Sequence, residues 1–76
     1  MMFEELKTYI CNYVDVAPEE ITMESRFIED LGFNSFDFMS LLGELEEHLQ
    51  VQVEDTAVLE LHTVADAVQY LESITQ

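Results

Sequence analysis

Three stretches of this chain place apolar residues three and four positions apart, which is the spacing of one face of an α-helix. They cover residues 3–14, 35–49 and 63–74. The alternating run at 51–54 is too short for a strand and has no second run to pair with, so we interpret it as a connector. A further short helix, capped by Asp55 and running through Leu61, is expected. The pattern predicts an all-α four-helix bundle with three longer helices and a short third one.

Helix ends are marked by capping residues and by one proline. Asn34 is a good N-cap with Asp37 three residues on, and Thr63 with Asp66 repeats this arrangement before the last helix. Pro18 cannot continue the first helix but can begin a short helical turn.

Size and charge limit the kinds of partner. The 76 residues are enough for one small domain, spanning 1–76. Seventeen Asp and Glu against two Lys and Arg give a net charge of −15. Such a surface repels nucleic acid and anionic membranes, so the partners should carry basic patches. No run approaches the roughly 18 apolar residues of a membrane span, and we predict no membrane insertion.

The compartment is suggested by the cysteine count and by the first residues. Cys11 is the single cysteine, so no internal disulfide can form, which fits a reducing environment. The acidic start does not resemble a secretory signal. We expect a cytoplasmic monomer.

The segment 30–37 is the strongest candidate for a functional site. Gly32 precedes the N-cap, and Phe33 and Phe38 are spaced as a hydrophobic staple around the helix start. Ser35 then becomes the first helical residue, with its hydroxyl beside unpaired backbone N–H groups. A phosphate attached there would meet the positive end of the helix dipole. The alternative is that Ser35 is a capping serine with no further role.

Catalysis and metal binding are weakly supported. No G-x-S-x-G elbow surrounds Ser35. His48 lies on the same helix, roughly 20 Å along its axis at 1.5 Å per residue, and His62 is expected to be a solvated loop residue. The acidic pairs lack metal-ligand spacing and are better interpreted as solvated faces. We predict neither an enzyme nor a metal site.

A second apolar stripe, offset from the core face, runs along the same helix and suggests a docking surface ringed by carboxylates. Gly43 within it costs about 1 kcal/mol relative to alanine, which suggests a packing or docking reason. Whether Met39 belongs to this stripe or to the core stays open. The predicted partner-binding residues are Asn34, Phe36, Asp37, Met39, Gly43, Glu44 and Glu47.

Residues 27–37, Phe-Ile-Glu-Asp-Leu-Gly-Phe-Asn-Ser-Phe-Asp, resemble the attachment motif of acyl carrier proteins. The similarity continues through Leu41-Leu42, Leu45-Glu46-Glu47, Asp55 and Thr63-Val64, and it covers essentially the whole chain. Acyl carrier proteins are small acidic four-helix bundles with this motif at the start of the second helix.

The resemblance implies a 4′-phosphopantetheine on Ser35, transferred from coenzyme A by a phosphopantetheinyl transferase. An acyl group would be carried on its thiol as a thioester, for a fatty-acid, polyketide or related specialised pathway. The partners would be acyl-loading and acyl-processing enzymes with basic docking patches. The alternatives are a D-alanyl or peptidyl carrier, and an unmodified carrier-like interaction module.

Three positions depart from the family's usual pattern. Asn34 stands in place of aspartate, Phe36 in place of leucine and Ser40 in place of a common glutamate. The loss of the carboxylate at Asn34 is expected to slow modification by a given transferase. Together with Phe38 and Gly43, these departures suggest a dedicated carrier in a specialised pathway.

Overall fold

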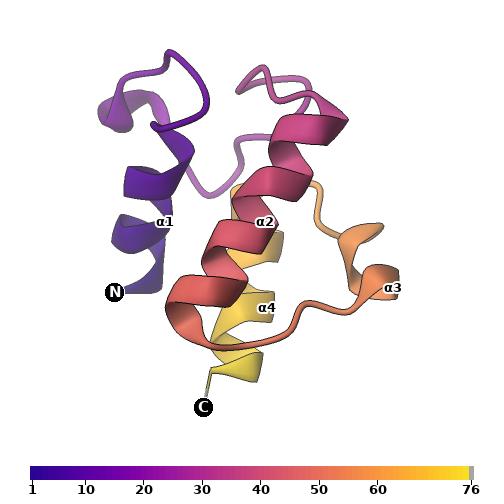
Figure 1. Cartoon of the computed structure of the whole chain (residues 1–76). Helices are drawn as coiled ribbons and strands as arrows, with labels where there is room; N and C mark the ends of the chain where they lie inside the picture. Colours follow the sequence, from indigo (N-terminus) through magenta and orange to yellow (C-terminus); the bar gives the residue numbers. More distant parts are fainter. Residues whose placement is uncertain (76) are drawn as a thin grey trace.

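The computed structural model describes residues 1–75. Figure 1 shows α1 running against α2 and α4, with the short α3 set to one side. Within residues 1–75 there is no strand, only an isolated antiparallel bridge between Arg26 and Thr63. None of the helices described combines the length and the apolar character needed to cross a membrane. The elements are α1 (Met2–Ile10), a 3₁₀ turn η1 (Pro18–Glu20), α2 (Ser35–Leu49), α3 (Asp55–Val58) and α4 (Val64–Ile74). The predicted all-α four-helix fold is confirmed.

The first helix is shorter than the sequence predicts, because it ends at Ile10 and not at Val14. The N–H groups of Asn12 and Tyr13 donate to the carbonyls of Tyr9 and Ile10, three residues back, at 3.1 and 3.0 Å. These tighter turns replace the α-helical pattern where asparagine and tyrosine, both weaker helix formers, follow one another. Tyr13 and Val14 still pack against the buried core, so they contribute the predicted apolar contacts without being helical.

The short third helix also begins and ends differently from the prediction. It covers Asp55–Val58 and does not reach Leu61. Asp55 is its first helical residue and not its cap, because Glu54 is the N-cap residue, without a side-chain capping bond. The N–H groups of Glu60 and Leu61 donate to carbonyls three residues back, at 2.9 and 3.2 Å. A tight turn therefore replaces further helix and brings Leu61 into the core.

The start of α4 agrees with its predicted capping box. Thr63 Oγ1 accepts the N–H of Asp66 at 3.1 Å. In return, Asp66 Oδ2 accepts the N–H groups of Thr63 and His62, each at 3.0 Å. The bond from the Thr63 N–H is the main cause that lowers the pKa of Asp66, and the bond from His62 adds to it.

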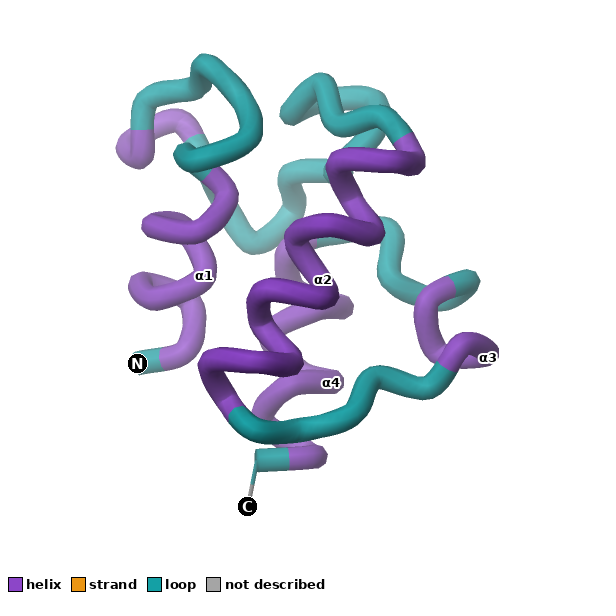
Figure 2. Tube along the Cα trace, viewed as in Figure 1, coloured by secondary structure: helices purple, strands orange, loops and turns teal. Residues whose placement is uncertain are grey.

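The long segment between α1 and α2, drawn mostly as loop in Figure 2, contributes side chains to the core. Ile21, Phe27, Leu31 and Phe33 are all buried in it. Backbone hydrogen bonds tie it to the start of α4. They join Phe27 N–H to the His62 carbonyl at 3.0 Å, Val64 N–H to Ser25 at 2.9 Å and Ala65 N–H to Met23 at 2.8 Å. The segment that leads into α2 is therefore held both by its buried side chains and by its backbone bonds to the start of α4.

Candidate functional site

Ser35 is the first residue of α2, as predicted, and it is exposed. Asn34 is the N-cap, and its Oδ1 accepts the N–H of Asp37 at 2.7 Å. The Asn34 carbonyl accepts the N–H of Phe38 at 2.9 Å, which closes the first helical turn. The predicted N-cap is confirmed, but within residues 1–75 the Asp37 side chain does not accept the Asn34 N–H, so the predicted variant of the capping box forms only in part. The N-cap fixes the backbone that carries the Ser35 hydroxyl.

Two backbone donors remain free at the same helix end. Within residues 1–75, the N–H groups of Ser35 and Phe36 have no hydrogen-bond partner, since Asn34 takes only that of Asp37. Together with the helix dipole, such donors favour an anion at this position. The surroundings of the Ser35 hydroxyl therefore suit a phosphate ester.

A closed turn sets the path of the chain into this cap. Asp30 Oδ2 accepts the backbone N–H of Arg26 at 2.8 Å and its side-chain Nε–H at 3.2 Å. The hydrogen bond from the Arg26 side chain is the main cause that lowers the pKa of Asp30. Gly32 then takes φ +85°, in the left-handed region that favours glycine. Arg26, Asp30 and Gly32 thus bring the chain back so that Phe33 enters the core directly before the cap.

Three phenylalanine rings pack beneath the N-terminal end of α2. Phe33 and Phe38 form the predicted staple, with ring centroids 6.3 Å apart and nearly perpendicular planes. Phe27, from the loop before α2, packs against both rings. Its ring centroid lies 5.6 Å from that of Phe33 and 4.9 Å from that of Phe38. All three are buried, so the first turn of α2 rests on a packed aromatic cluster.

An apolar hollow of about 420 Å³ opens beside Ser35. Residues of the loop, of α2 and of the α3 region line it, with Met39 on the rim at 50% exposed. Met39 therefore belongs neither wholly to the core nor to the outer face of α2. The lining residues are Ile28, Ser35, Phe38, Met39, Val58, Leu59, Leu61 and His62.

The other predicted partner-binding residues are divided between two sides of α2. Phe36, Gly43 and Glu47 are exposed and share the outer face by their spacing, with Phe36 78% exposed next to Ser35. A side-chain Cβ added at Gly43 would meet nothing within 4 Å, so close packing does not require this glycine.

Asp37 and Glu44 lie toward the turn that follows α1. Tyr13 Oη donates to Glu44 Oε1 at 2.9 Å. This hydrogen bond is the main cause that raises the pKa of Tyr13, and the charge of Asp37 adds a smaller part. Glu44 is therefore partly engaged within the chain, which the spacing of residues along α2 does not reveal.

The two histidines differ in their relation to Ser35. His48 packs its ring on Tyr9 of α1, with centroids 5.4 Å apart, as a residue of the far end of α2 would. His62 is an exposed loop residue, as expected, and it lines the hollow together with Ser35. Within residues 1–75, no hydrogen bond joins the two side chains, so the arrangement does not form a nucleophile–base pair.

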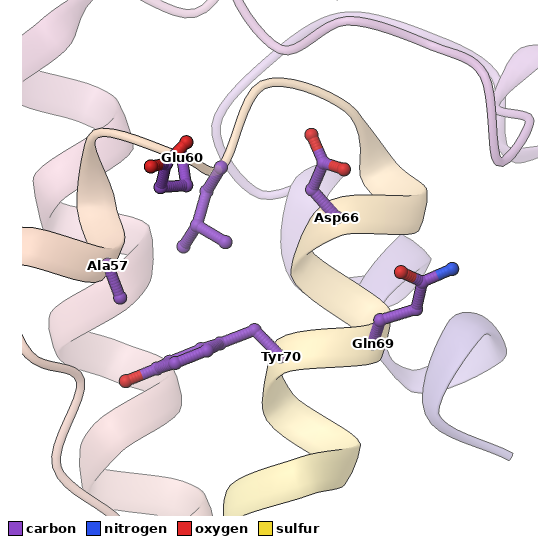
Figure 3. A pocket seen from close by; sticks show the side chains of 6 residues that line it. Ala57, Glu60, Asp66, Gln69 and Tyr70 are labelled. Atoms are coloured by element: carbon purple, nitrogen blue, oxygen red, sulfur yellow. The ribbon is translucent and has the colours of Figure 1, made fainter.

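A second hollow of about 390 Å³ lies between α3 and α4, away from Ser35. Figure 3 shows the Tyr70 ring crossing from α4 toward Ala57, with Glu60, Asp66 and Gln69 around the opening. Its carboxylates do not converge on a metal site, and no group of three metal-ligating side chains occurs in the part of the chain described.

Three comparisons place this geometry among known proteins. Residues 4–71 match the family model described as a phosphopantetheine attachment site. The chain is similar to an acyl carrier protein of Clostridium perfringens, at 41% identity over 75 residues covering 99% of both chains. It is also similar to one of Wolinella succinogenes, at 36% over 72 residues covering 95% of both. The solved acyl carrier protein of Enterococcus faecalis superposes with a TM-score of 0.83 at 25% identity, over 96% of this chain and 92% of that one.

Proposed function

The chain belongs to the acyl carrier protein family, and we propose from this premise that Ser35 is the residue that carries its 4′-phosphopantetheine arm. The position of Ser35, exposed as the first residue of α2 and within the matched range 4–71, is the observation that supports this most. When attached, the arm supplies a terminal thiol that holds an acyl group as a thioester.

The residues around Ser35 fit a phosphodiester. The free N–H groups of Ser35 and Phe36 can donate to its oxygens, and the helix dipole favours its negative charge. Asn34 has a neutral side chain, and its Oδ1 is turned toward Asp37, so no carboxylate of the cap repels the phosphate. In this proposal the chain holds and presents the arm, and its partners do the chemistry.

The partners we propose are a phosphopantetheinyl transferase and acyl-loading or acyl-processing enzymes with basic patches. The carboxylates that would meet these patches are Asp37, Glu44 and Glu47. They are not neutralised by Lys7 or Arg26, because these two basic side chains are paired with other carboxylates of this chain. Phe36 and Met39 would add apolar contacts beside Ser35, and Gly43 would allow close approach to the helix. Binding is expected to weaken as salt is added, because exposed charges are screened.

An intact-mass measurement tests the attachment site. The apo-protein is incubated with coenzyme A, Mg²⁺ and a promiscuous transferase, beside Ser35→Ala and the matched control Ser40→Ala from the same helix. We expect one phosphopantetheine on the unaltered chain and on Ser40→Ala, and none on Ser35→Ala. Absence of any gain with several transferases would favour the unmodified interaction module, and Asn34→Asp would then show whether the cap is responsible.

The cargo and the pathway need a separate test. Asn34, Phe36 and Ser40 lie in the first turns of α2, where a partner would meet the carrier. This supports our proposal of a dedicated carrier within fatty-acid, polyketide or related synthesis. We expect no complementation of a fatty-acid carrier deletion, and growth would contradict the proposal. Loading assays with amino acids separate a D-alanyl or peptidyl carrier.

We propose that the carrier acts as a single cytoplasmic domain and as a monomer.

A further inference from the structure

Phe38 and Leu61 are the most buried of the side chains that line the hollow beside Ser35, and we take them as its floor, with Phe38 on the α2 side. This ring is only 8% exposed, and it lies against Phe27 with the ring centroids 4.9 Å apart. Phe33 backs the pair, with its ring 5.6 Å from Phe27 and 6.3 Å from Phe38. Because protein interiors are close-packed, these three rings close the route from the hollow into the bundle.

The rim of the hollow, in contrast, is apolar and open. Ile28 from the loop, Met39 from α2 and Leu59 next to α3 are 51%, 50% and 76% exposed. Large apolar side chains from three separate segments therefore surround one opening that also includes Ser35. An aliphatic group that covered them would remove apolar surface from water. An acyl chain on an arm at Ser35 would have a higher effective concentration at this opening than the same group free in solution.

We propose that Phe38 restricts the cargo to short aliphatic acyl groups by closing the floor of this hollow. The inference rests on the proposed arm at Ser35. A volume of about 420 Å³ corresponds to roughly fourteen water-sized groups, and the end of the arm takes part of it. An acyl chain up to about hexanoyl or octanoyl therefore fits, and further methylenes project into water.

The rate of thioester cleavage by hydroxylamine reports how far the chain is sheltered. Each methylene that enters the hollow is expected to favour the sheltered state about fourfold. The apo-protein is loaded from acyl-coenzyme A thioesters, from acetyl to dodecanoyl, by a promiscuous transferase. Intact mass first confirms one acylated arm, absent in Ser35→Ala.

For the unaltered chain we expect cleavage to slow with each added carbon pair to about octanoyl and then to stay constant. In Phe38→Ala the slowing should continue to dodecanoyl, because the floor is removed. Phe3→Ala is the matched control, since this ring lies in α1, does not line the hollow and should leave the profile unchanged. Far-ultraviolet circular dichroism checks that each variant is folded.

If Phe38→Ala does not fold, Met39→Trp tests the same point from the rim without touching the core. The larger ring should fill the hollow and move the limit to butanoyl or shorter. Slowing that continues to dodecanoyl in the unaltered chain, no dependence on chain length, or a profile that neither variant changes would overturn the inference. Failure at the mass step would instead overturn the proposed attachment at Ser35, and this inference with it.

Discussion

The two walls of the hollow beside Ser35 are built in different ways. The α2 wall begins with a capped first turn that rests on Phe27 and Phe33, both buried. The α3 wall is a four-residue helix without a side-chain cap, none of its residues is buried, and Leu59 beside it is largely exposed. The hollow therefore joins a firmly held first turn of α2 to a weakly held α3 wall, and we expect the α3 wall to open at a lower free-energy cost than the turn that bears Ser35.

Removal of the Phe27 ring should weaken the α2 wall and give the largest loss of unfolding free energy among these predictions. Phe27→Ala deletes a ring in contact with two other rings and should cost about 3–5 kcal/mol of unfolding free energy. Leu59→Ala in the α3 wall should cost less than about 0.5 kcal/mol. Urea unfolding measures both, with the slope checked for equality. Similar losses in the two variants would mean that the walls are held equally.

The capping residues offer a second comparison of the same two walls. Asn34→Ala removes the acceptor of the Asp37 N–H and should lower stability by about 1 kcal/mol. Glu54→Ala at the start of α3 should have little effect, because Glu54 makes no side-chain cap bond. Thermal unfolding of the two variants side by side measures the difference. A larger loss in Glu54→Ala would reverse the comparison.

The end of the α3 wall is anchored by Asp66, and acid should release it. The pKa of Asp66 is lowered in the folded state, so its contribution is complete above the unfolded value of about 3.9 and is lost as the pH falls through the folded value. The stability advantage of the unaltered chain over Asp66→Asn should therefore be constant at neutral pH and vanish in strong acid. Urea midpoints across this range measure the advantage, and an advantage that persists in strong acid would contradict the assignment.

The smallest effect is expected at Gly43, on the exposed outer face of α2. Gly43→Ala should raise stability by about 0.5–1 kcal/mol, because the added Cβ meets no atom and the helix gains a better former. Thermal unfolding measures the gain. The same variant should bind partners less tightly if close approach at Gly43 matters, which separates stability from docking. A loss of stability would show that the added methyl group is not accommodated on this face.

The parts of this fold that follow local rules could be predicted from the sequence. Asn34 with Asp37, and Thr63 with Asp66, set the starts of two helices through bonds across three residues. The staple of Phe33 with Phe38 has equally short reach. These local signals are sufficient to place Ser35 at the first position of a helix.

The parts that were missed depend on residues far apart in the chain. The Tyr13 hydroxyl donates a hydrogen bond to Glu44 across thirty-one positions, and no local sequence pattern predicts that contact. The hollow combines Ile28 and Leu59 with α2, so it exists only after the bundle has assembled. Glu46 Oε2 accepts the N–H of Val53 at 2.7 Å and turns the connector, which the alternation of 51–54 does not reveal. Helical periodicity likewise could not distinguish the α-helix of 2–10 from the tight turns that follow it.

The hydrogen bonds between the long loop and the start of α4 have a consequence for biosynthesis. Phe27 and Ser25, which set the approach to Ser35, are held by His62 and Val64. The ribosome adds those residues only after α2 and α3 have been made. If Ser35 is modified as we propose, a nascent chain without residues 62–65 lacks the bonds that hold this approach, and we expect modification to follow the synthesis of α4. Under this proposal, we expect coenzyme A to be used mainly by chains whose synthesis is nearly complete.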